Sequence, residues 1–211
     1  MLTFVSSCVA IGGIVGHPFR SWQPQGGDGS YMWIRDALPA RLPHVRFYIY
    51  GYDPAAANRT STPTVKSIST APIHTLQAHN LGVPSAKPLL LLAHCLGGVV
   101  LKQALVQAAD GCETKPSNVL DKVKGAIFFG VPSHPVRSDQ LSIMAGNRSD
   151  VSLEGELAGK SEFLRELDRR FAGIPRRADM KILWAYETEP TLTTEVTSHP
   201  VDCFIPRRLV D

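Results

Sequence analysis

Apolar residues gather in five short runs, which polar turns or helical patterns separate from one another. The runs are mostly unalternated, which is typical of strands buried on both faces of a parallel sheet. Turn residues bound several runs, such as Gly51 after the second and Pro88 before the third. The pattern therefore predicts five buried strands, at residues 2–11, 45–50, 89–93, 123–129 and 180–186.

Residues with helical spacing lie between the predicted strands. In residues 97–109, apolar or small side chains recur every three or four positions and form one amphipathic face. Another such face lies in residues 161–171, where Ser161 is a suitable N-cap, and a third helix is expected over residues 33–42. The alternation of strands and helices predicts an α/β fold, a mostly parallel sheet with helices on both faces.

The stretch LLLLAHCLGGVV at residues 89–100 combines an apolar strand, a tight turn and the start of a helix. This is the context of a nucleophile elbow, G-x-S-x-G, whose neighbours two positions away must be small. Ala93 and Gly97 meet that requirement, and Cys95 takes the nucleophile position. A helix N-terminus lowers the pKa of a thiol and so favours the reactive thiolate. The alternative interpretation is a small buried thiol behind a core strand.

Composition excludes several classes of protein. The chain has 211 residues, 44% of them hydrophobic and 19% charged, which fits one globular domain. A net charge of +3 without any block of like charges argues against nucleic-acid binding. The four cysteines lack metal-ligand spacing, so we expect no metal and a reducing, cytoplasmic location. The stretch at residues 12–16 does not fit a dinucleotide fingerprint and no Walker A sequence occurs, so we expect no cofactor. No apolar run is long enough for a transmembrane segment.

Several segments, taken in order, resemble lipase-like serine esterase domains of the α/β-hydrolase class. Such domains occur at the N-terminus of fungal NACHT, ankyrin and TPR proteins. The resemblance rests on GIVGHPFRSW at 13–22, WIRD at 33–36, YGYD at 50–53, AHCLGGVVLKQAL at 93–105, GAIFFGVPSH at 125–134 and YET at 186–188. We therefore expect an incomplete hydrolase core at residues 1–191, truncated at its C-terminal side, and a divergent or disordered tail at 192–211.

The resemblance implies a Ser-His-acid hydrolase that acts on small-molecule or lipid esters. The nucleophile position falls on Cys95 and the acid on Glu187, while Ile14 and Leu96 would supply the two backbone amides of an oxyanion hole. The family's histidine segment is not recognisable here. His199 follows Glu187 in chain order and is the candidate base, and His134, after the fourth predicted strand, is the other candidate.

Three departures from the family pattern leave the function open. Cys95 replaces the serine, Gly12 replaces a histidine that precedes the Gly-rich loop, and the pattern ends near residue 191. The chain is accordingly a hydrolase with an acyl-enzyme on Cys95, a catalytically inactive hydrolase-fold module for interaction or signalling, or a truncated gene product. A five-strand sheet without its usual neighbours exposes edges, so we expect marginal stability or a protein partner that covers them.

Overall fold

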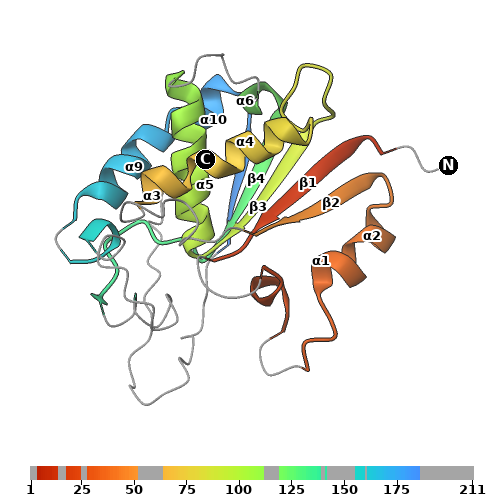
Figure 1. Cartoon of the computed structure of the whole chain (residues 1–211), viewed down its shortest axis with the longest axis horizontal. Coiled ribbons are helices and arrows are strands. Elements are labelled where there is room, and N and C mark those ends of the chain that lie inside the picture. The colour runs from red at the N-terminus through yellow and green to blue at the C-terminus, as the bar shows by residue number, and fades with distance from the viewer. Residues whose placement is uncertain are drawn as a thin grey trace.

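The computed structural model describes residues 4–13, 18–24, 28–51, 64–111, 119–138, 141, 155–159 and 161–185. Within them, five parallel strands form one sheet in the order β2-β1-β3-β4-β5 (Figure 1). The five predicted strands are confirmed, at β1 (Ser6–Ile11), β2 (Val45–Tyr50), β3 (Leu89–His94), β4 (Val123–Phe129) and β5 (Lys181–Ala185). All carboxyl ends therefore lie along the same edge of the sheet.

Helices cover both faces of the sheet, as the alternating pattern predicts (Figure 1). One face carries α3 (Val65–Ile68), α4 (Thr70–Ala78), α5 (Leu96–Asp110), α6 (Val119–Lys122), α9 (Phe163–Phe171) and α10 (Ile174–Arg177). The opposite face carries η1 (Arg20–Trp22), α1 (Trp33–Asp36) and α2 (Leu38–Arg41).

The single helix predicted over residues 33–42 is wrong, because the chain forms two short helices that meet at Ala37. Proline has no N–H, so Pro39 cannot donate to the carbonyl of Arg35 as a continuous helix requires. Pro39 instead lies in the first turn of α2, where no such bond is needed. The predicted N-cap Ser161 is wrong by one position, because Glu162 is the N-cap of α9, although Ser161 Oγ accepts the N–H of Phe163 at 3.2 Å.

α5 is more deeply buried than its predicted amphipathic pattern suggests. Every residue from 96 to 106 is buried, including Lys102 and Gln103. The cause is packing on several sides, because α5 contacts the sheet, α3 and α4, and α9. The helix that follows the turn at Cys95 is therefore fixed along three turns, which gives the turn a firm base.

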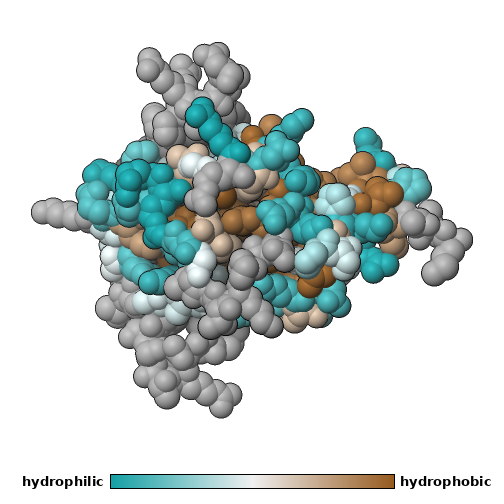
Figure 2. Space-filling model, turned by 90° about the horizontal axis from the view of Figure 1, so that it is seen from above, coloured by the Kyte–Doolittle hydropathy of each residue, from teal (hydrophilic) through white to brown (hydrophobic). Residues whose placement is uncertain are grey.

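The two outer strands, β2 and β5, form the edges of the described sheet. Leu183 of β5 is 62% exposed, and Val5, just before β1, is 57% exposed. Figure 2 shows apolar side chains among the polar surface on the side where β1 begins. Among the described residues, no helix combines the length and the apolar character needed to cross a bilayer.

Candidate functional site

A sharp turn joins β3 to α5 at Cys95, as the sequence predicts. Cys95 has φ 53° and ψ −132°, a region that non-glycine residues rarely adopt. Its N–H donates to the carbonyl oxygen of Phe129 at 2.9 Å, and its own carbonyl accepts the N–H of Gly98 at 2.9 Å. The strained backbone is thus held from both sides, by β4 and by the first turn of α5.

Small neighbours make this turn possible. A Cβ added at Gly97 would lie 2.0 Å from the carbonyl oxygen of Gly12, and one added at Gly98 would lie 2.1 Å from Cγ2 of Val131. Ala93, on the other side of the turn, is fully buried. Both glycines are therefore required by close approach, and Gly97 lets the end of β1 pass directly against the start of α5.

The start of the Gly-rich loop lies beside the turn. A Cβ added at Gly13 would be 3.8 Å from the Cβ of Cys95. The N–H of Gly13 donates to Oγ of Ser21 in η1 at 3.1 Å, and that hydroxyl also lies 2.9 Å from the place of a Cβ at Gly12. Ser21 is a site residue that was not predicted, because a serine after a Gly-rich loop is not a distinctive sequence signal.

The carboxyl edge also brings the ends of β4 and β5 to the turn. The register aligns His94, Phe129 and Ala185 across three strands, and Gly130 N–H donates to the carbonyl of Ala185 at 2.9 Å. Glu187 follows Ala185 by two positions but lies outside the described residues. β5 thus ends beside β4, the strand whose Phe129 carbonyl accepts the N–H of Cys95.

An aromatic cluster supports the turn from the opposite face of the sheet. The Trp22 ring makes edge-to-face contacts with Trp33, His94 and Phe129, with ring centroids 5.7 to 6.1 Å apart. His94 thus contacts Trp22 on the face that carries η1. Trp22 is 2% exposed, so this cluster packs closely against the end of β3.

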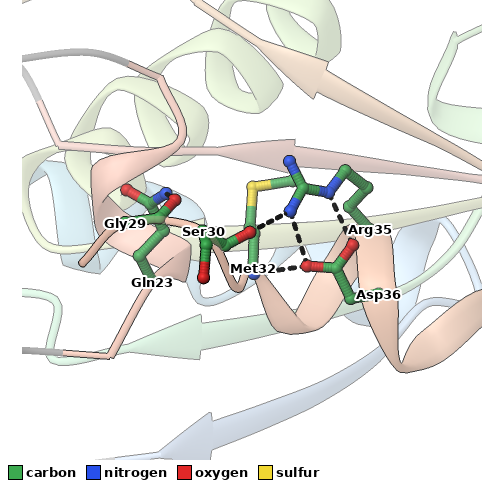
Figure 3. Close-up of polar contacts among 6 residues, drawn as sticks. All are labelled: Gln23, Gly29, Ser30, Met32, Arg35 and Asp36. Atoms are coloured by element: carbon green, nitrogen blue, oxygen red, sulfur yellow. Dashed lines mark hydrogen bonds and ion pairs between the residues drawn. The ribbon is translucent and has the colours of Figure 1, made fainter. Parts of the chain in front are cut away.

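On the same face, a polar network joins α1 to the residues just before it (Figure 3). Arg35 pairs with both carboxylate oxygens of Asp36 at 2.6 and 2.7 Å, and also donates to the carbonyl of Ser30. Asp36 accepts the N–H of Met32 at 2.7 Å. The Arg35 guanidinium, and then this amide, lower the pKa of Asp36 to about 2. Met32 is 2% exposed, so the network fixes a buried residue of the smaller apolar cluster.

A partly buried ion pair on the other face joins α5 to α9. Lys102 is 1% exposed, and its Nζ lies 2.7 Å from a carboxylate oxygen of Asp168 in α9 and 4.8 Å from the Trp184 ring centroid in β5. Burial lowers the pKa of Lys102, against the opposing effect of Asp168. The ammonium therefore ties α5, α9 and β5 together behind the site.

The structure places only part of the predicted site. Cys95 lies at the turn and Leu96 is the first residue of α5, while Ile14, Glu187 and His199 lie outside the described residues. His134 is exposed in the segment after β4. The predicted boundary at residue 191 also falls outside the described part. No group of three metal-ligating side chains occurs within the ranges that the structure describes.

No family model matches this sequence. Protein SERAC1 of Danio rerio is 25% identical over 197 residues, which cover 85% of this chain and 30% of that protein. Protein SERAC1 of Homo sapiens is 26% identical over 199 residues, with 86% and 30% covered. The chain thus spans about 30% of the length of these curated relatives.

Among solved structures, phospholipase PlaB from Legionella pneumophila in complex with thio-NAD gives a TM-score of 0.60 at 12% identity. The match covers 92% of this chain and 40% of that one. A second structure of the same phospholipase gives 0.59 at 13% identity, with 88% and 40% covered. The fold is of the α/β-hydrolase type. At such low identity the likeness concerns architecture, and it places the turn at Cys95 in a hydrolase-type sheet.

Proposed function

We propose that the chain is an acyl hydrolase that forms a covalent intermediate on Cys95. The observation that carries the proposal is the backbone of Cys95, which keeps φ at 53° between a buried strand and a buried helix. Such strain persists where the surrounding structure enforces it, and it is common at active sites. It presents the thiol at the N-terminus of a 15-residue helix, where negative charge is stabilised.

In the proposed reaction, the Cys95 thiolate attacks the carbonyl carbon of an ester and a C–S bond forms. The carbonyl oxygen becomes an oxyanion, for which we propose the amides of Leu96 and Ile14 as donors. The ester C–O bond then breaks, and the leaving alcohol takes the proton that the base received from the thiol. Water hydrolyses the acyl-cysteine and returns the thiol. We assign the base to His199 and its orienting acid to Glu187.

The motifs in residues 13–134 and 186–188 resemble those of lipase-like esterases, including the domains of fungal NACHT, ankyrin and TPR proteins. This resemblance supports ester hydrolysis as the reaction. The name of phospholipase PlaB, which shares the fold, fits a small-molecule or lipid ester as substrate. The irregular spacing of the four cysteines in the sequence supports a reducing compartment such as the cytoplasm.

Turnover of 4-nitrophenyl butyrate and of a short-chain acyl thioester tests the proposal. The wild type should release product with a stoichiometric burst, and Cys95→Ala should not. Cys8→Ala is the matched control, because Cys8 is buried in β1, away from the turn. Equal rates in wild type and Cys95→Ala would overturn the assignment of the nucleophile.

The second candidate function is an inactive hydrolase-fold module for interaction or signalling. It is favoured by the cysteine at position 95 and by Gly12, both departures from the serine esterase pattern. It predicts that iodoacetamide at neutral pH modifies Cys95 no faster than Cys112 or Cys203. Selective modification of Cys95 would count against it. Transcript sequencing past codon 211 tests the further alternative of a truncated gene product.

We also propose that a protein partner covers the sheet edges, because Leu183 of the outer strand β5 is 62% exposed. An apolar edge strand invites pairing with another chain. A monomeric elution volume together with a single cooperative melting transition of the isolated chain would contradict this proposal.

A further inference from the structure

Ser21 connects the Gly-rich loop to the helical turn η1 by a side-chain hydrogen bond. Its Oγ accepts the N–H of Gly13 at 3.1 Å. Gly13 directly precedes Ile14, the proposed oxyanion donor, and the place of its Cβ lies 3.8 Å from the Cβ of Cys95. Ser21 therefore holds the Gly12–Gly13 peptide, which lies beside the turn at Cys95 and one residue before the proposed donor.

The hydroxyl of Ser21 also accounts for the glycine at position 12. A Cβ on Gly12 would lie 2.9 Å from Oγ and 3.4 Å from Cβ of Ser21, which is closer than side chains normally pack. The space beside the loop is thus occupied by Ser21 rather than by a side chain at position 12. In this chain a residue nine positions later supports the loop from outside.

Packing keeps η1, and hence Ser21, in place. The neighbouring Trp22 is 2% exposed and contacts the rings of His94 and Phe129. His94 precedes Cys95, and the carbonyl of Phe129 accepts the N–H of Cys95. The same short helix therefore contacts the Gly-rich loop through Ser21 and the base of the turn through Trp22.

We infer that Ser21 is a positioning residue that fixes Gly13, where the proposed oxyanion loop begins, relative to Cys95. This inference rests on the proposed function. Acylation of a thiol by an ester needs stabilisation of an oxyanion, whereas alkylation by iodoacetamide forms none. Loss of the Ser21 hydroxyl should therefore slow acylation and leave alkylation unchanged.

The experiment compares Ser21→Ala with Ser67→Ala. Ser67 also accepts a backbone N–H through its hydroxyl, that of Thr64 at 2.9 Å, but it does so in α3. Three quantities are measured on each folded variant: hydrogen exchange of the Gly13 amide by NMR, the nitrophenolate burst from 4-nitrophenyl acetate, and the rate of Cys95 alkylation. Ser21→Thr and Ser21→Val form a second pair of equal shape that differs in the hydroxyl alone.

We expect Ser21→Ala to speed exchange at Gly13 and to slow acylation about tenfold, with alkylation and Ser67→Ala unchanged. Ser21→Thr should retain acylation, and Ser21→Val should lose it. Unaltered exchange at Gly13, or a parallel fall in acylation and alkylation, would overturn the role of Ser21. Absence of acylation in the wild type would instead refute the proposed function, and the positioning role would fall with it.

Discussion

Cys8 and Cys95 carry the same side chain on neighbouring strands in opposite settings. Cys8 lies within β1 in the smaller apolar cluster, where burial raises the pKa of its thiol to about 12. Cys95 is half-buried and follows the last residue of β3, with a positive φ at the start of α5. The same residue type therefore lies buried within a strand at position 8 and at a tight turn before a helix at position 95, and the setting of a thiol governs its reactivity.

The largest expected effect separates the two thiols by function. Cys95→Ala should lower ester turnover on the order of a thousandfold or more, because the proposed nucleophile is lost. Cys8→Ala should leave turnover unchanged, since a thiol with so high a pKa is protonated at neutral pH. Initial rates with 4-nitrophenyl butyrate measure both. A comparable loss in the two variants would remove the contrast between them.

A second change acts on the turn itself. Gly97→Ala places a methyl group 2.0 Å from the carbonyl oxygen of Gly12, so β1 and α5 must separate. We expect a loss of about 3 kcal/mol in the free energy of unfolding, measured by urea denaturation, and a changed alkylation rate at Cys95.

Gly173→Ala is the matched control for Gly97→Ala. A Cβ at Gly173 meets nothing within 4 Å, and the φ of −85° there suits any residue. Its effect should stay within about 0.5 kcal/mol. Equal losses for the two glycines would show that the close approach at Gly97 carries no special cost.

A third test concerns pH and the buried thiol. The pKa of Cys8 rises from 9.0 to about 12 on folding, so its protonated form stabilises the fold. That contribution is complete below pH 9 and is lost as the pH rises toward 12, by at most about 1.4 kcal/mol per pH unit. Urea unfolding from pH 8 to 10.5 should show a steeper decline for wild type than for Cys8→Ala. Parallel curves would mean that Cys8 is not buried as described.

The smallest effect is expected from the polar network at Met32, which belongs to the same apolar cluster as Cys8. Arg35 and the Met32 amide depress the pKa of Asp36 to about 2, so its contribution is present above the usual aspartate pKa and is lost as the pH falls toward 2. Asp36→Asn should flatten this acid dependence of melting. It should also slightly raise the alkylation rate of Cys8 by loosening Met32, while the rate at Cys95 stays constant.

The fold was largely predictable because its signals are local. Continuous apolar runs specify strands buried on both sides, and the alternation with helices specifies a parallel sheet. Two of these predictions differ from the structure because a proline or the packing of neighbouring helices determines the result. Pro39 divides one expected helix into two, and α5 is buried beyond its amphipathic stripe because α9 and α3 pack on its flanks.

The site was predictable only in part. The small residues around Cys95 follow from the steric needs of a tight turn, so the pattern at 93–97 found them. The hydrogen bond from Gly13 to Ser21 depends on how two segments meet in space, and nothing in the spacing specifies it. The ion pair of Lys102 with Asp168 joins residues 66 positions apart and was invisible for the same reason.

The strand order has a consequence for biogenesis. Among the five described strands, β1 is synthesised first and lies between the next two, since β2 adds to one side of it and β3 to the other. β4 and β5 then join in order on the β3 side alone. Chains fold vectorially as they are synthesised, so this sheet can grow outward without reopening any pair already formed. The strand that leads to Cys95 would therefore pair with β1 before β4 and β5 are synthesised.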